Sequence, residues 1–140
     1  MIHLVTGGSG SGKSAYAEQC ILDFGGTRRV YIATMQPFGA EGQARIARHR
    51  KMRVAKQFST IECYTNLKEV ELEPGSDVLL ECMSNLTANE IFDPSGAGKA
   101  RAEEEILAGV SRLAHQARNL VLVTNEIFSD GYRYEEETME

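Results

Sequence analysis

Residues 7–14 read Gly7-Gly8-Ser9-Gly10-Ser11-Gly12-Lys13-Ser14, which fits the pattern G-x-x-x-x-G-K-[ST] at every fixed position. The run Ile2–Thr6 before it predicts a short buried strand, and Ser14–Phe24 after it predicts a helix. The glycines allow the backbone to fold around an anion and to turn its N–H groups inward. The positive end of the helix dipole points at the same place. The stretch therefore predicts a loop that binds the phosphates of a nucleotide.

Two side chains at the end of this loop have distinct expected roles. Lys13 would reach the β- and γ-phosphates, and the hydroxyl of Ser14 would be a ligand of Mg²⁺. The alternative is a flexible Gly/Ser-rich loop, but such a loop gives no reason for Gly-Lys-Ser at the junction of a strand and a helix. Nucleotide binding is therefore the preferred interpretation.

The composition of the 140 residues is that of a globular domain, with 42% apolar and 25% charged residues. A net charge of −5 argues against a general nucleic-acid binder. No apolar run approaches the roughly 18 residues needed to span a bilayer, and no secretory signal is visible. Cys20, Cys63 and Cys82 are scattered, which favours reduced thiols and disfavours a structural zinc site. We expect one cytoplasmic domain over residues 1–140, with no nucleic-acid partner and no stable membrane insertion.

Apolar runs that suit strands alternate with stretches of helical periodicity along the rest of the chain. The expected strands are 29–34, 58–64, 77–82 and 119–126, and the expected helices are 41–55, 84–92 and 99–118, with a helical turn at 66–70. This alternation predicts an α/β fold with a mostly parallel sheet and helices on both faces. Ligands of such sheets bind outside the carboxyl ends of the strands. The ends expected to meet there are the phosphate loop, Ala33-Thr34, Glu81 and Asn125-Glu126.

A phosphate loop is usually accompanied by an acidic residue that closes an apolar strand and holds Mg²⁺ directly or through water. No apolar run in this chain ends in Asp, but Val78-Leu79-Leu80 ends in Glu81, which is the preferred metal or nucleotide contact. The alternative is a carboxylate that merely solvates a strand end. Glu126 is a weaker candidate, and Glu62 is weaker still.

The expected helix 41–55 is basic, because residues 41–56 hold six Arg or Lys against one Glu. Such a segment in an acidic protein suggests a small anionic ligand. Spacings of four place Arg45, His49 and Arg53 on one stripe of the helix. The neighbouring cations favour a neutral imidazole, which could attack phosphorus while arginines hold the phosphate oxygens. The alternative is a plain phosphate-binding helix in which His49 has no chemical role.

Several motifs occur together in one order. They are Val5-Thr6-Gly7-Gly8, Ser11-Gly12-Lys13-Ser14, Tyr31-Ile32-Ala33-Thr34, Arg45-Ile46 with His49-Arg50, Leu79-Leu80-Glu81-Cys82 and Val123-Thr124-Asn125-Glu126. In this order and spacing they resemble the bifunctional adenosylcobinamide kinase / adenosylcobinamide-phosphate guanylyltransferase family of cobalamin biosynthesis. The resemblance covers the whole chain, and the strand-end motifs are more specific than the phosphate loop.

The resemblance implies a P-loop NTPase of RecA-like fold and a homo-oligomer, often a trimer. It also implies two reactions. A nucleoside triphosphate, ATP or GTP, phosphorylates the aminopropanol hydroxyl of adenosylcobinamide; GMP is then transferred from GTP through a guanylylated histidine, giving adenosylcobinamide-GDP and pyrophosphate. The histidine falls on His49, and Lys13 is the second catalytic residue.

The nucleotide contacts that carry over are Gly7, Gly8, Ser9, Gly10, Ser11, Gly12, Lys13, Ser14, Ala33, Thr34, Met35, Arg50, Lys51, Met52, Arg53, Glu62 and Glu81. Ser14 and Glu81 would hold Mg²⁺. Many members have His-His where this chain has Arg48-His49, so only the second position carries over. Members also continue past the segment matched by Glu136-Glu137-Thr138 with a further helix and strands, so we expect an apolar sheet edge to be left exposed.

Two other functions stay open at the level of sequence. One is a P-loop kinase of a different small alcohol or nucleotide, which needs no histidine intermediate. The other is a nucleotide-binding module without catalytic activity.

Overall fold

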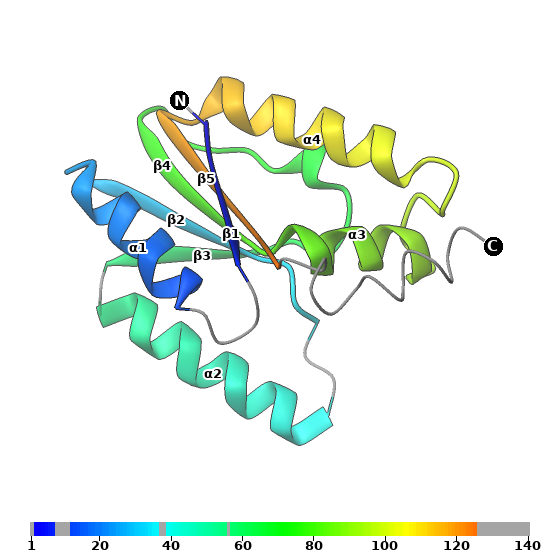
Figure 1. Ribbon diagram of the computed structural model, residues 1–140, viewed down its shortest axis with the longest axis horizontal. Coiled ribbons are helices and arrows are strands. Elements are labelled where there is room, and N and C mark those ends of the chain that lie inside the picture. The colour runs from blue at the N-terminus through cyan, green and yellow to red at the C-terminus, as the bar shows by residue number, and fades with distance from the viewer. Residues whose placement is uncertain (1, 8–11, 37–38, 56, 126–140) are drawn as a thin grey trace.

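The computed structural model describes residues 2–7, 12–36, 39–55 and 57–125, and only the backbone is described at Asn125 and at several positions of the second helix (Figure 1). The elements in chain order are β1 (Ile2–Gly7), α1 (Lys13–Asp23), β2 (Arg28–Ala33), α2 (Gly39–Ala55), β3 (Phe58–Glu62), the 3₁₀ helix η1 (Leu67–Glu69), β4 (Ser76–Glu81), α3 (Met83–Phe92), α4 (Ala102–Gln116) and β5 (Asn119–Asn125). No helix in this described part is both long and apolar enough to cross a membrane.

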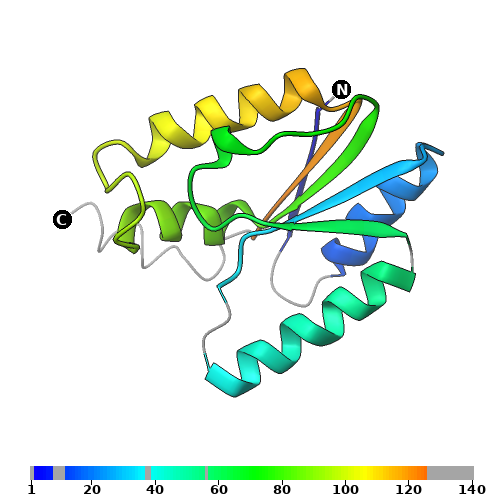
Figure 2. The ribbon, with the colours of Figure 1, turned by 180° about the vertical axis from the view of Figure 1, so that it is seen from behind.

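The strands form one five-stranded sheet in the order β1-β5-β4-β2-β3, and every pairing is parallel. This confirms the predicted α/β class. Figures 1 and 2 place α1 and α2 on one side of the sheet and α3 and α4 on the other. The division follows from right-handed crossovers, because the chain moves toward the β3 edge through α1 and α2 and returns through η1, α3 and α4.

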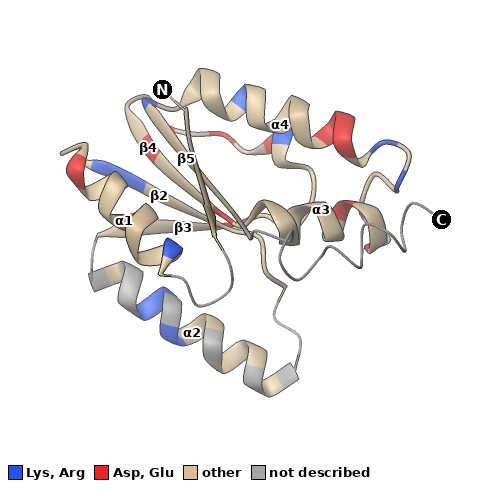
Figure 3. Cartoon of the chain, viewed as in Figure 1, with Lys and Arg blue, Asp and Glu red and all other residues tan. Residues whose placement is uncertain are grey.

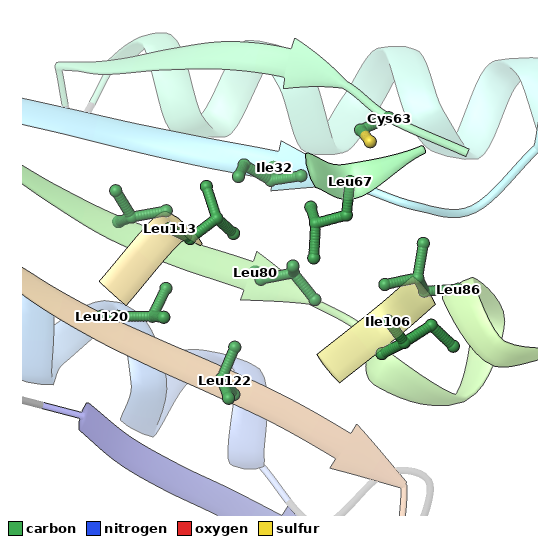
Figure 4. Packing of buried hydrophobic residues seen from close by; sticks show 10 residues of the cluster. Ile32, Cys63, Leu67, Leu80, Leu86, Ile106, Leu113, Leu120 and Leu122 are labelled. Atoms are coloured by element: carbon green, nitrogen blue, oxygen red, sulfur yellow. The ribbon is translucent and has the colours of Figure 1, made fainter. Parts of the chain in front are cut away.

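The sheet is buried between two apolar clusters. On the α3 and α4 face, the cluster shown in Figure 4 includes Ile32, Leu80, Leu86, Leu113 and Leu120. On the other face, α1 packs Ala17 and Ile21 against residues of the central strands, among them Tyr31, Leu79 and Val121. Strand β4 contributes to both faces and is buried from Ser76 to Leu80, as expected for a central parallel strand.

The prediction that β1 is a buried strand is wrong for one of its faces. Ile2 and Leu4 are 53% and 63% exposed, while Val5 on the opposite face is 9% exposed. In the described residues β1 pairs with β5 alone, so it forms an edge of the sheet. Register places Leu4 beside Leu122, but in the described part of the chain Leu4 is not a member of the buried cluster to which Leu122 belongs.

The predicted element boundaries agree with the structure to within about three residues. The largest differences are at α4, which begins at Ala102 and ends at Gln116 instead of spanning 99–118. Before the helix, Gly98 N–H donates to Glu90 O, and this contact holds the chain in a turn. After the helix, Arg118 N–H donates to Ser76 O, so the chain has already turned toward β5.

Candidate functional site

Because every pairing is parallel, the carboxyl ends of the strands lie at one edge of the sheet, as the sequence predicts. Strand β1 ends at Gly7 and α1 begins at Lys13, while Gly8, Ser9, Gly10 and Ser11 lie outside the described residues. Gly12 has a φ of +83°, a left-handed conformation that explains why this position of the pattern is glycine. Its carbonyl accepts the Tyr16 N–H at 3.1 Å and starts the helix.

A hollow of about 500 Å³ opens beside this junction. Its described lining comes from Leu4, Val5, Thr6 and Gly7 of β1, from Gly12, and from Lys13 and Tyr16 of α1. Lys13 therefore lies at the edge of open space where the helix dipole is positive, a suitable position for an anionic group.

Glu81 lies directly against the phosphate-loop helix. The Ser14 hydroxyl donates a hydrogen bond to Glu81 Oε2, although 67 residues separate the two in sequence. Strand β5 lies between β1 and β4, and α1 spans this distance because it packs across β1, β5 and β4. The expected convergence of Ser14 and Glu81 is therefore present in the fold.

Ser14 and Glu81 fit a site for Mg²⁺. A hydroxyl and a carboxylate are hard oxygen donors, and Mg²⁺ beside a nucleotide takes its remaining ligands from phosphates and water. In the described residues no group of three or more His, Cys, Asp or Glu side chains could form a metal site. The donors agree with a shared site of protein and nucleotide oxygens, and the assignment of Mg²⁺ stays a prediction.

Tyr31 is a member of this site that the sequence reading missed. Its hydroxyl donates to Glu81 Oε1 at 2.8 Å, so each oxygen of the carboxylate has its own donor. Tyr31 is 6% exposed, and the sequence placed it only in the expected strand 29–34 and in one of the family motifs. A local pattern does not reveal this contact, because it joins neighbouring strands that are 50 residues apart.

The predicted contact Thr34 is fully buried and hydrogen-bonded within the protein. Its hydroxyl donates to Cys82 O and accepts from Cys82 N–H, both at 2.8 Å. Its N–H donates to Glu81 O at 3.2 Å, and its carbonyl accepts from Asn89 Nδ2 at 2.7 Å. Thr34 thereby fixes the backbone that follows Glu81, a second arrangement that sequence reasoning missed. Ala33 and Met35 flank it at the same strand end.

The segment after Thr34 is held from the opposite direction. Gln36 Nε2 donates to Asp93 Oδ2 at 2.8 Å, and the Ser95 N–H donates to the other oxygen of Asp93 at 2.8 Å. These hydrogen bonds hold the pKa of the Asp93 carboxyl below its usual range, and the bond from the Ser95 N–H has the larger effect. The loop after α3 is thus attached to the connection that leads from β2 toward α2.

Two predicted nucleotide contacts, Arg50 on α2 and Glu62 at the end of β3, form an ion pair with each other. Both side chains are partly exposed, at 48% and 40%. Figure 3 shows blue Lys and Arg positions along α2. The cations of this helix whose side chains are described are Arg48, Arg50 and Lys51, so the described part of the helix is basic, as predicted. The ion pair places Arg50 at the carboxyl end of β3, because Glu62 is the last residue of that strand.

Other predicted residues cannot be compared with side-chain positions. His49, Met52 and Arg53 lie within α2, as does Arg45, and the structure describes only their backbone. Glu126 lies outside the described residues. The roles proposed for these residues therefore stay predictions.

The three cysteines are free thiols, in agreement with the sequence. Burial, with smaller contributions from the negative charges of Glu90 and Glu69, raises the pKa of the Cys63 thiol to about 11. Cys63 is thus a protonated core residue at neutral pH, and it supplies no thiolate nucleophile.

Comparison with known proteins points to one family. A family model described as "Cobinamide kinase / cobinamide phosphate guanyltransferase" matches residues 3–138. Two relatives carry the name "Bifunctional adenosylcobalamin biosynthesis protein CobU". The one from Escherichia coli (strain K12) is 35% identical over an alignment of 140 positions, and the one from Salmonella typhimurium (strain LT2) is 36% identical over the same length. Each alignment covers 91% of this chain and 76% of the relative.

Proposed function

The chain belongs to the cobinamide kinase / cobinamide phosphate guanyltransferase family, and we propose that it uses one nucleotide site for both reactions. It is a P-loop enzyme of adenosylcobalamin biosynthesis that phosphorylates adenosylcobinamide with a nucleoside triphosphate and then transfers GMP from GTP to the phosphate so formed. We expect a cytoplasmic homotrimer, as the family resemblance implies.

The contact between Ser14 and Glu81 is the observation that best supports the kinase step. It joins the phosphate loop to the acidic strand end, the combination that holds a metal–triphosphate complex in P-loop enzymes. Bound there, Mg²⁺ would neutralise charge on the phosphates. Lys13 and the N–H groups of the loop bind the β- and γ-phosphates, so that the substrate hydroxyl can attack the γ-phosphorus. The nucleoside diphosphate leaves, and the hydroxyl proton is released.

GMP transfer needs a nucleophile that the kinase step does not need. An imidazole nitrogen of His49 attacks the α-phosphorus of GTP, and pyrophosphate leaves. A phosphate oxygen of adenosylcobinamide phosphate then attacks the same phosphorus, which gives adenosylcobinamide-GDP and restores His49. Support comes from the place of His49 in α2 between two arginines, one of which, Arg50, is oriented by Glu62.

The test is covalent labelling with GTP that carries a label on its α-phosphate. The parent protein should retain label after denaturation, and the label should be lost in acid and retained in base, as expected for a phosphoramidate. His49→Ala should abolish this label, because it removes the nucleophile. Much of the kinase turnover should persist, because that step needs no covalent intermediate and alanine preserves the helix. His115→Ala is a matched control, since His115 is exposed on α4 and its Nδ1 contacts only the Ser111 carbonyl among the contacts described.

Label that survives in His49→Ala would place the nucleophile elsewhere. Kinase turnover without any label in the parent protein would favour a P-loop kinase of a small alcohol. Nucleotide binding without label or turnover would favour a binding module.

A further inference from the structure

The two oxygens of the Glu81 carboxylate have different surroundings. Oε2 accepts from Ser14 on the phosphate-loop helix, and Oε1 accepts from Tyr31 in the interior at 2.8 Å. The Tyr31 ring is packed in the α1-side cluster with Ala17, Ile21 and Leu79, so its hydroxyl has little freedom to move. Oε2 therefore lies on the side of the phosphate-loop helix, while Oε1 is held on the interior side by Tyr31.

We propose that Tyr31 is a positioning residue that makes Glu81 a one-oxygen ligand and thereby favours Mg²⁺ over Ca²⁺ at the phosphate loop. The inference rests on the proposed function, in which Glu81 lies on the metal side of the bound triphosphate. In this proposal Tyr31 acts through Glu81 and is not itself a ligand of the metal.

The physical reason lies in the coordination chemistry of the two cations. Mg²⁺ requires near-octahedral geometry with oxygens at about 2.0–2.1 Å, which a carboxylate satisfies with a single oxygen. Ca²⁺ accepts longer distances of about 2.3–2.6 Å and often binds both oxygens of one carboxylate. A hydrogen bond that occupies Oε1 therefore opposes two-oxygen binding and keeps Oε2 in one orientation.

The backbone around Glu81 is fixed independently of Tyr31. Thr34 bonds both the N–H and the carbonyl of Cys82 through its buried hydroxyl, and its own N–H donates to Glu81 O. Removal of the Tyr31 hydroxyl should therefore release the carboxylate and leave the main chain in place. The effect of a Tyr31→Phe substitution should be confined to the metal-dependent part of nucleotide binding.

The experiment measures binding of a non-hydrolysable GTP analogue to the full chain in EDTA, in Mg²⁺ and in Ca²⁺. For Tyr31→Phe we expect unchanged affinity in EDTA. The gain in affinity that Mg²⁺ gives over EDTA should fall by about fivefold or more, the size expected for one lost hydrogen bond. The gain that Ca²⁺ gives should stay equal or rise. Tyr64→Phe is the control, because Tyr64 is a partly buried tyrosine in the turn after β3 and is not part of the site.

A double-mutant cycle with Glu81→Gln separates this inference from a general loss of packing. If Tyr31 acts through Glu81, Tyr31→Phe should have no further effect on Mg²⁺ dependence once Glu81 is replaced. An equal loss of affinity in EDTA and in Mg²⁺, or an unchanged ratio of Mg²⁺ to Ca²⁺ gain, would overturn the proposal. If Glu81→Gln alone leaves the Mg²⁺ gain intact, the metal role of Glu81 fails, while labelling of His49 still tests GMP transfer separately.

Discussion

At the scale of single residues, the site depends on hydroxyl groups that fix one carboxylate. Ser14 and Tyr31 donate to the two oxygens of Glu81, and Thr34 holds the peptide that follows it. A fixed carboxylate costs little reorganisation when charge must be neutralised during phosphoryl transfer. Lys13 supplies the positive charge at the same place, beside the hollow between β1 and α1.

Lys13→Ala should abolish both reactions, because both need the triphosphate held by one loop. The loss of a charge-assisted contact to a transferring phosphoryl group predicts a decrease of at least about 100-fold in kcat/KM. Steady-state kinase kinetics and single-turnover labelling measure the two steps. Lys68→Ala is the control, since Lys68 lies on η1 and pairs with Glu105. Kinase turnover within about tenfold of the parent would exclude this loop as the active phosphate site.

At the scale of elements, the connections between strands are held by specific contacts. The buried carboxylate of Glu90 on α3 accepts the N–H of Asn66 before η1 and the N–H of Ala97 in the loop after α3. Helix α4 approaches η1 so closely that a Cβ at Gly109 would lie 2.7 Å from Leu67 Cβ. Glycine is therefore needed at position 109 for this close packing, although it has poor helix propensity.

Gly109→Ala should lower stability although alanine is the better helix former. The added methyl group would overlap Leu67, and overpacking of this kind costs about 1–3 kcal/mol against a propensity gain of about 1 kcal/mol. Urea unfolding measures the net change. Ala108→Gly, at an exposed position of the same helix, measures the difference in helix propensity between alanine and glycine without a packing change. A Gly109→Ala protein that is more stable than the parent would show that η1 can move away at little cost.

At the scale of the whole molecule, a stabilising ion pair and the nucleotide site lie at opposite ends of the sheet. Asp77 is the second residue of β4, is fully buried, and accepts from Arg118 and from Asn119 Nδ2. Arg118 also donates to Phe24 O at the end of α1, so one guanidinium joins the starts of β4 and β5 to the first helix. The phosphate loop and Glu81 lie at the other ends of the strands.

Arg118→Ala should therefore reduce stability without changing nucleotide affinity. The substitution leaves Asp77 buried with Asn119 as its remaining described side-chain partner. Because Asp77 is buried and Arg118 is half-exposed, we expect the free energy of unfolding to fall by about 2–3 kcal/mol. Urea unfolding and nucleotide titration at low temperature measure the two quantities. Arg101→Ala removes an exposed arginine from Glu105, which keeps its ion pair with Lys68, and should change the free energy of unfolding by less than about 0.5 kcal/mol. A loss of nucleotide affinity in Arg118→Ala would show that the two ends of the sheet are coupled.

The sequence by itself determined the features that depend on local chemistry. The phosphate loop requires glycine where φ is positive, and the element order follows from apolar periodicity, so the parallel α/β fold and the strand-end position of Glu81 could be predicted. Only the tertiary structure decided which side chains meet. The sheet order makes β1 an edge with Ile2 and Leu4 exposed, and it brings Tyr31 and Thr34 to the end of β4. These contacts join residues about 50 apart, and the order and register of the strands place them together, which no local pattern encodes.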